Sequence, residues 1–218
     1  MDKATGLLQT LLSGSCEWMV ALTPEQAASS LQAAIDAGIN FINSADIYGN
    51  GKSETVFGQA LKLSGINRDQ LFIQSKGGIV LDSQRSWGDL VFGQRYDFSK
   101  QHLLATVDGI LSRMGIDYLD AFLLHRPDPL MELDEVAAVF DELETSGKVR
   151  HFGVSNFNSR QIEMLKTAVK QTLLINTKCN SRWLTRGWLI LESIPICVTK
   201  VLSTVMVALS SMHGNTLP

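Results

Sequence analysis

Short apolar runs alternate with amphipathic segments between about residues 23 and 177 of this chain. Five of these runs have the composition of strands buried on both faces, because they lack the strict alternation that one water-facing side would impose. The predicted strands are residues 39–42, 71–75, 118–124, 150–155 and 172–175.

The segments between these runs carry apolar residues at helical spacing, which predicts helices. The predicted helices begin at or just after Thr23, Ser53, Ser99, Leu133 and Ser159, of which the first three are predicted N-caps. The last helix is expected to run to about Val169. Residues 79–97 show no clear period, and we expect a long loop there.

A strict alternation of strand and helix is typical of parallel strands joined by right-handed crossovers. Two architectures have this pattern, an open doubly wound sheet and a (β/α)8 barrel. No Gly-x-Gly-x-x-Gly turn follows the first strand, and polar residues end several different strands, so the barrel is favoured. We therefore predict an α/β fold of (β/α)8 TIM-barrel type. It is expected to be incomplete, because about 155 residues fit the pattern and a typical barrel takes about 250.

The composition changes abruptly after residue 177. The predicted division is a short lead-in (1–22), a partial barrel (23–177) and a divergent tail (178–218). The tail holds one of the 22 acidic residues but two of the four tryptophans and two of the three cysteines. A shifted reading frame or a retained intron would produce such a change, a hypothesis that the coding nucleotides around residue 177 would settle.

Composition and charge exclude several classes of partner. The chain has 218 residues, a net charge of −3 and 45% apolar residues, so neither nucleic acid nor an anionic membrane is expected as a partner. The apolar stretch 188–210 contains Glu192, Pro195 and Lys200, which argues against a membrane span. The three cysteines are widely spaced, which favours a reducing, cytoplasmic location over a disulfide framework.

Three candidate catalytic residues follow the first three predicted strands. Tyr48 lies in a loop after the first, Lys76 ends the second and His125 ends the third. Carbonyl reduction needs a proton donor beside a hydride donor; an ammonium makes a phenol, of pKa about 10, a better acid, and an imidazole can orient the carbonyl. Each residue also has a structural interpretation: a loop tyrosine, a solvated lysine and a hydrogen-bonded strand-end histidine. Spacing alone leaves both open.

Other chemistries have weaker support in the sequence. No His-x-His pair or acidic cluster suggests a metal site, and no nucleophile elbow suggests a hydrolase. An unrelated metal-dependent barrel enzyme would therefore need ligands that the sequence does not display.

Several ordered stretches resemble the aldo/keto reductase family. Residues 37–49, with Ser53-Glu54 after them, resemble its first signature, and residues 73–76 resemble its strand ending in the active-site lysine. Residues 115–128 resemble its second signature, which ends in the active-site histidine. The segments Ser146–Arg150 and Phe152–Phe157 resemble the helix end and strand that follow.

The resemblance implies a (β/α)8 barrel that reduces a small carbonyl substrate, an aldehyde or ketone, with NADP(H) as cofactor. It implies Tyr48 as general acid, Lys76 as its tuning partner and His125 as the residue that orients the carbonyl. Ser155 and Asn156 match positions that hold the nicotinamide carboxamide, and Asn176 matches a further position on the cofactor.

Three departures from the family pattern lead us to expect weakened activity. Asn43 stands where the family has an aspartate, which would hold the lysine by a charge-assisted bond about twice as strong as a neutral one. Thr177 stands where a glutamine usually follows Asn176. No family pattern is visible from residue 178, where the adenosine phosphate loops are expected. The alternative is a catalytically inactive, cofactor- or partner-binding barrel fragment. Unpaired barrel edges also predict self-association.

Overall fold

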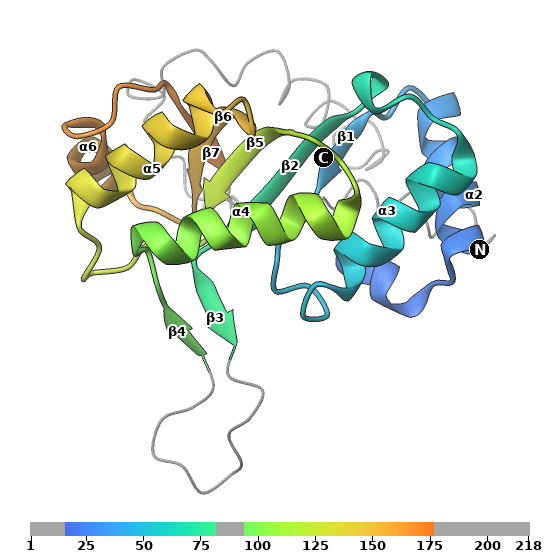
Figure 1. The fold of residues 1–218 in the computed structure, drawn as a ribbon, viewed down its shortest axis with the longest axis horizontal. Helices are drawn as coiled ribbons and strands as arrows, with labels where there is room; N and C mark the ends of the chain where they lie inside the picture. Colours follow the sequence, from blue (N-terminus) through green and yellow to red (C-terminus); the bar gives the residue numbers. More distant parts are fainter. Residues whose placement is uncertain (1–15, 82–93, 177–218) are drawn as a thin grey trace, which may run out of the picture.

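A computed structural model describes residues 16–81 and 94–176 of the chain, and within them five strands form one parallel sheet (Figure 1). All four neighbouring pairs in this sheet are parallel. The sheet contains, in spatial order, β1 (Phe41–Asn43), β2 (Phe72–Gly77), β5 (Leu119–Leu124), β6 (Val149–Ser155) and β7 (Leu173–Asn176).

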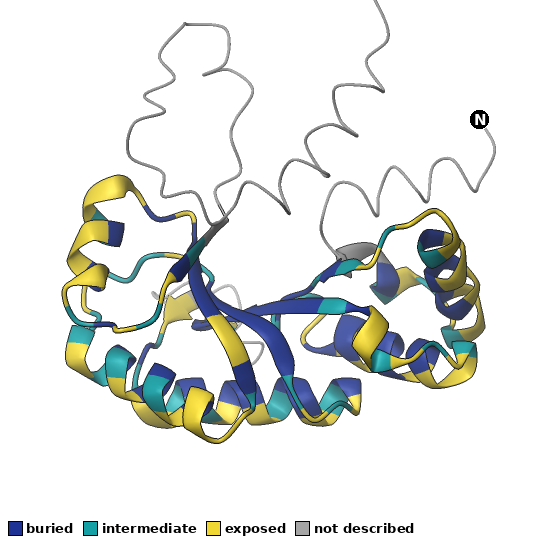
Figure 2. Cartoon of the chain, turned by 90° about the horizontal axis from the view of Figure 1, so that it is seen from above, coloured by how far each residue is buried: buried dark blue, intermediate teal, exposed yellow. Residues whose placement is uncertain are grey.

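The order of these strands decides between the two predicted architectures. A doubly wound sheet reverses its strand order at a switch point, whereas here the order in space follows the order in the chain. Right-handed crossovers between successive strands then place the helices on one side, and Figure 2 shows them outside the curved sheet. The helices are α2 (Pro24–Asp36), α3 (Lys52–Ser64), α4 (Lys100–Met114), α5 (Leu133–Thr145) and α6 (Ser159–Lys166), with short 3₁₀ turns η1 (Cys16–Ala21) and η2 (Arg68–Gln70).

The core lies between the sheet and these helices. Phe140 of α5 stacks on Phe152 of β6 with ring centroids 4.4 Å apart, and both side chains are fully buried. The helices also approach each other closely: a Cβ on Gly58 of α3 would collide with the backbone carbonyl oxygen of Met114 on α4. Close packing of this kind fixes the height at which each strand ends.

The opposite face of the sheet carries an aromatic row near its N-terminal end. The rings of Phe41 and Phe72 stack with centroids 5.5 Å apart, and Phe72 stacks on His151 at 6.5 Å. These residues come from β1, β2 and β6, so side chains of three strands share one level of the curved inner face.

Two of the three predicted N-caps are confirmed and one is wrong. The hydroxyl of Thr23 accepts from the amide of Gln26 in a capping box, and that of Ser99 accepts from the amide of His102. The second helix instead has Gly51 at its N-cap, in a left-handed conformation with φ of 83°. Glycine adopts this conformation without the steric cost that a side chain would carry, and Ser53 lies buried in the first turn.

The predicted loop over residues 79–97 is wrong at both ends. Strands β3 (Ile79–Leu81) and β4 (Gln94–Tyr96) pair antiparallel, and the amide of Asp97 donates to the carbonyl of Gly78. Three residues a strand are too few to show a period in the sequence. The last helix is also shorter than expected, because the amides of Thr167 and Ala168 donate to carbonyls three residues back, in tighter turns than those of an α-helix.

Several predictions lie outside the described residues, including the tail 178–218 and the apolar stretch 188–210 within it. The division of the chain at residues 22 and 177 therefore stays a prediction. Within residues 16–81 and 94–176, no helix is both long and apolar enough to cross a membrane.

Candidate active site

The second strand separates its side chains between the two faces of the sheet. The hydroxyl of Ser75 donates to Glu54 of α3, so this side chain faces the helices. Because successive side chains of a strand point to opposite faces, Gln74 and Lys76 face the curved inner side. Lys76 is the penultimate residue of β2 and only 3% exposed, which places its ammonium inside the C-terminal end of the sheet.

This ammonium donates to neutral oxygens at the end of the first strand and just beyond it. The Nζ of Lys76 donates to Oδ1 of Asn43 at 2.5 Å and to the backbone carbonyl of Ser44 at 2.6 Å. Asn43 is the last residue of β1, and its Oδ1 also accepts from the side-chain amide of Gln74 at 3.1 Å. Asn43 therefore makes the contact to Lys76 that the aspartate of the family pattern was expected to make.

Tyr48 and His125 lie beside this lysine. The Nζ of Lys76 is 5.2 Å from the centroid of the Tyr48 ring, and the rings of Tyr48 and His125 meet edge-on with centroids 6.2 Å apart. Backbone hydrogen bonds place all three: the amide of Asp46 donates to the carbonyl of Lys76, and that of His125 to the carbonyl of Gly77. The structure brings the three predicted catalytic residues together at one end of the sheet.

The predicted cofactor residues lie at the same end. Ser155 is the last residue of β6 and is buried, and Asn156 follows it in the left-handed region with φ of 64°. The side-chain amide of Asn156 donates to the carbonyl of His125 at 2.9 Å and to Oγ of Ser155 at 3.0 Å. Asn176 ends β7 opposite Ser155 in the strand register, but its side chain lies outside the described part of the chain.

An ionic cluster behind the lysine was not predicted from the sequence. Glu54 is fully buried and accepts from Nε of Arg113 at 2.7 Å and from Oγ of Ser75 at 3.1 Å. Burial raises the pKa of Glu54, against the lowering effect of Arg113. Burial and then the charge of Glu54 raise the pKa of Asp46 to about 7, while Lys76 acts weakly in the opposite direction.

Two of the side chains around Lys76 leave a signal in the sequence, and a third does not. Glu54 interrupts the apolar side of its helix, and Gln74 lies two positions before Lys76 on the same strand, so periodicity could have identified both. Arg113 could not be found in this way, because it meets Glu54 across 59 residues of sequence. In the described ranges, no three side chains are arranged to hold a metal ion.

Comparison with known proteins identifies a family. The sequence model of the Aldo/keto reductase family matches residues 12–184. Oxidoreductase YdhF of Escherichia coli is 39% identical over 155 residues, which cover 71% of this chain and 51% of that protein. Uncharacterized oxidoreductase YcsN of Bacillus subtilis is 43% identical over 148 residues, 68% of this chain and 49% of the relative. The chain therefore spans about half the length of the curated relatives it matches.

Solved structures agree with this assignment. An aldo-keto reductase from Bacillus halodurans in its holo form superposes with a TM-score of 0.62 at 25% identity, over 74% of this chain and 51% of that one. An aldo-keto reductase from Klebsiella pneumoniae in complex with NADPH gives 0.53 at 29% identity, over 67% and 44%. The prediction of a (β/α)8 barrel type with incomplete coverage is confirmed.

Proposed function

The chain belongs to the aldo/keto reductase family, and from this premise we propose that it reduces an aldehyde or ketone to an alcohol with NADPH. The observation that carries the proposal is the convergence of Tyr48, Lys76 and His125 at the C-terminal end of one parallel sheet. In barrels of this type, the ends of several strands together build the active site.

Tyr48 acts as the general acid. A bound nicotinamide cofactor would supply the hydride to the carbonyl carbon. As the electron pair of the C=O π bond moves to oxygen, the phenol of Tyr48 would give that oxygen its proton. The ammonium of Lys76, 5.2 Å from the ring centroid, stabilises the negative charge that the phenol gains. His125, edge-on to the phenol ring, orients the carbonyl toward Tyr48.

The described residues fit the nicotinamide end of the cofactor. A carboxamide needs one hydrogen-bond donor and one acceptor side by side, and the hydroxyl of Ser155 with the amide of Asn156 offers both. Asn176, opposite Ser155 in the register, is the third proposed contact. The backbone of Asn156 lies in the left-handed region, and its side-chain amide donates to the carbonyl of His125 and to Oγ of Ser155. These bonds preorganise the Ser155–Asn156 pair at the end of β6.

Asn43 weakens this activity without removing it. Its Oδ1 keeps the contact to Lys76, but an amide contributes no counter-charge. Asn43→Asp is expected to raise turnover at least about fivefold, because a full charge at hydrogen-bond distance is worth roughly 1 kcal/mol even in high dielectric. An unchanged or lower turnover would contradict this role.

Two measurements test the proposal on the purified chain. NADPH is titrated by fluorescence quenching, and turnover of a generic aldehyde is then followed at saturating cofactor. We expect the natural chain to bind NADPH and to reduce the aldehyde slowly. The Tyr48→Phe variant should bind NADPH without reducing the aldehyde. Binding without turnover in the natural chain favours the alternative, a non-catalytic cofactor- or partner-binding barrel fragment. If the chain neither binds NADPH nor turns over the aldehyde, both the proposal and this alternative are contradicted.

Two further proposals concern the setting of the protein. The outer strands of the described sheet, β1 and β7, are each paired on one side only among the described residues, which favours self-association through strand edges. A monomeric mass by light scattering at micromolar concentration would contradict this. The wide spacing of the three cysteines supports a reducing location in the cytoplasm.

A further inference from the structure

The carboxylate of Glu54 joins three separate elements of the fold. Glu54 lies in the first turn of α3, and its side chain is fully buried. Its Oε1 accepts from Oγ of Ser75 on β2 at 3.1 Å, and its Oε2 accepts from Nε of Arg113 on α4 at 2.7 Å. Each oxygen of this one side chain therefore fixes α3 to a different element.

This carboxylate lies behind the active site and not in it. Ser75 faces the helices, whereas Lys76, the next residue of β2, faces the curved inner side of the sheet, where Tyr48 lies beside it. Because the sheet separates the two sides, a substrate bound beside Tyr48 does not touch Glu54. Glu54 can act on the reaction only through the elements that it holds.

The turn that carries Tyr48 has little stiffness of its own. The three residues that join Tyr48 to α3, residues 49–51, have positive φ values of 58°, 56° and 83°. Two of them are glycines, which lose more conformational freedom on folding than any other residue type. The position of the phenol therefore depends on bonds on either side of the turn.

Two hydrogen bonds to β2 flank this turn. Before it, the backbone amide of Asp46 donates to the carbonyl of Lys76 at 3.1 Å. After it, the carboxylate of Glu54 accepts from Ser75, the residue that precedes Lys76. Because the two bonds reach adjacent residues of one strand, together they set how far the turn lies from Lys76, whose Nζ is 5.2 Å from the centroid of the Tyr48 ring.

The packing around Arg113 directs its guanidinium at Glu54. A Cβ on Gly51 would lie 2.8 Å from Nε of Arg113, and a Cβ on Gly109 would lie 2.8 Å from its Nη1, so the arginine lies directly against both glycines. A buried ion pair is weak evidence for stability, because the cost of removing its charges from water offsets their attraction. What the pair secures is orientation, since it holds Oε2 and leaves Oε1 of Glu54 for Ser75.

We propose that Glu54 is a positioning residue that holds the turn of Tyr48 at the distance from Lys76 that proton transfer requires. It does so through its bonds to Ser75 and Arg113. The inference rests on the proposed function, because it concerns the placement of the general acid. Loss of the bond to Ser75 should slow the chemical step without weakening the binding of NADPH, whose proposed contacts lie at the ends of β6 and β7.

The first test removes this bond from the side of the strand. Ser75→Ala is expected to lower the single-turnover rate of aldehyde reduction about tenfold and to change the Kd of NADPH less than about twofold, because a small displacement of a reacting group is costly. The control Ser30→Ala removes another buried hydroxyl, which donates to the carbonyl of Gln26 in α2, and should leave both unchanged. A rate for Ser75→Ala that stays within about twofold of the natural chain, or that falls no more than that of Ser30→Ala, would overturn the inference.

The second test replaces Glu54 in two ways. A glutamine can still accept from Arg113 through its carbonyl and donate to Ser75 through its NH₂, so Glu54→Gln should keep the single-turnover rate within about threefold of the natural chain. Glu54→Ala keeps neither bond and should lower the rate at least about tenfold. Equal losses would show that the charge is needed and not the position, which overturns the inference. If Glu54→Ala does not fold, Ser75→Ala takes its place in this comparison.

Amide hydrogen exchange tests the same bond without turnover. The exchange rate of the Asp46 amide, which donates to Lys76, is divided by that of the His125 amide, which also donates to β2. Ser75→Ala should raise this ratio at least about fivefold, because the turn opens locally more often once the bond is lost. Ser30→Ala should leave the ratio unchanged, because a loss of global stability affects both amides alike.

The turnover and exchange measurements separate the inference from the proposed function. An exchange ratio that Ser75→Ala does not change overturns the inference even if the chain reduces aldehydes. A raised ratio in a chain that reduces no aldehyde supports the anchoring of the turn by Glu54 and contradicts the proposed function alone.

Discussion

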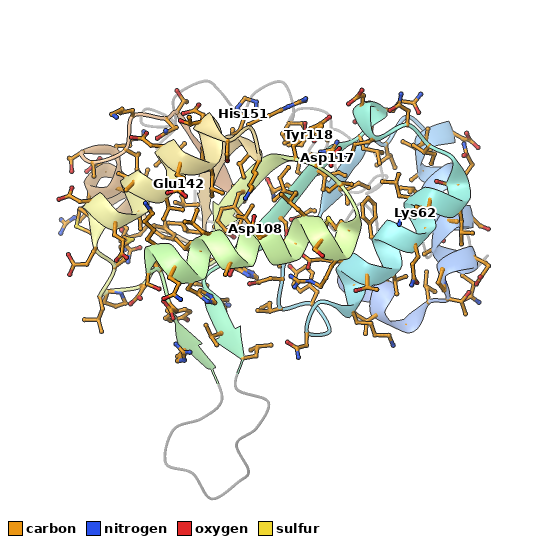
Figure 3. The ribbon with its side chains drawn as sticks, in the orientation of Figure 1. Lys62, Asp108, Asp117, Tyr118, Glu142 and His151 are labelled. Carbon is orange, nitrogen blue, oxygen red and sulfur yellow. The ribbon has the colours of Figure 1, made fainter. Side chains whose placement is uncertain are left out.

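The two ends of the sheet each bring a tyrosine, basic side chains and a polar partner together, with opposite consequences. At the N-terminal end, the ring of Tyr118 lies between the guanidinium groups of Arg68 at 4.1 Å and Arg150 at 3.8 Å. Figure 3 shows Tyr118 and His151 at the end of the sheet far from the β3–β4 hairpin, which follows the C-terminal end of β2.

The difference lies in what holds each phenol and each cation. The hydroxyl of Tyr118 donates to Asp69 at 2.7 Å, and this bond, with burial, raises the pKa of the phenol. Asp120 pairs with Arg68 at 2.7 Å and Arg150 at 3.3 Å, so that end is an ion-paired support. At the C-terminal end the ammonium of Lys76 is bound by neutral oxygens. A cation near a phenol therefore does not by itself indicate a reactive site, because at the N-terminal end Asp69 and Asp120 hold the phenol and the guanidinium groups in place.

The largest expected effect compares the two tyrosines. Tyr48→Phe should lower turnover by about 10²- to 10⁴-fold, because the proton donor to the carbonyl oxygen is lost. NADPH binding, measured by fluorescence quenching, should change less than about twofold. The matched Tyr118→Phe should leave turnover within about twofold of the natural chain. If both substitutions reduced turnover equally, the distinction between the two ends would fail.

The next largest effect is on stability, at the N-terminal end. Asp120 is buried and accepts from Arg68, from Arg150 and from the backbone amide of Ile73 at 2.8 Å. Asp120→Asn should lower the free energy of unfolding by roughly 3 kcal/mol, because the guanidinium of Arg68 loses its charged partner in a mostly buried place. Urea unfolding monitored by circular dichroism measures this. A loss below about 1 kcal/mol would mean that this end is not held by charge.

A carboxylate at the C-terminal end should have the opposite effect. The pKa of Asp46 is raised to about 7 in the folded protein from an ordinary 3.8. The folded state then binds more protons than the unfolded state between these values, so Asp46 lowers stability as pH rises through this window. Asp46→Asn should therefore be more stable than the natural chain by roughly 1–3 kcal/mol at pH 8. This range is smaller than the full rise in the pKa of Asp46 would give, because partial exposure to solvent screens its charge.

This gain should be nearly lost at pH 4, because Asp46 stays protonated in the folded state there and pH 4 lies close to its ordinary pKa of 3.8 in the unfolded chain. Urea unfolding at pH 4, 6 and 8 gives the comparison, with Asp134→Asn as the control for net charge. A constant difference across this range would show that packing, and not ionisation, separates the two chains. A gain in stability with a loss of turnover would mark Asp46 as a residue retained for function.

The smallest expected effect removes the hydrogen bond of Tyr118. Tyr118→Phe keeps the ring between the two guanidinium groups and deletes the hydroxyl that donates to Asp69. The expected loss is about 1 kcal/mol in the free energy of unfolding, typical of one partly exposed hydrogen bond. Thermal unfolding can resolve it. A loss as large as that of Asp120→Asn would show that the hydroxyl, and not the ion pairs, holds this end.

Much of the fold and of the candidate site could be predicted from local sequence. Buried parallel strands are nearly continuous apolar runs, and each ends where polar residues begin, so the positions of Asn43, Lys76, His125 and Ser155 at strand ends were visible. The short strands β3 and β4 were missed because three residues show no period. The N-cap at Gly51 was missed because its positive φ follows from the turn around Tyr48, which local capping preferences do not describe.

The sequence by itself determined the alternation of elements, and with it the shared end of the sheet where the polar residues meet, since parallel strands joined by helices must point the same way. Only the tertiary structure decided which charges meet there. Glu54 and Arg113 are 59 residues apart in sequence, and Arg68 and Asp120 are 52 apart. Whether two such groups pair depends on a few ångströms of helix and strand packing, because the energy of a charge pair varies with its separation and burial.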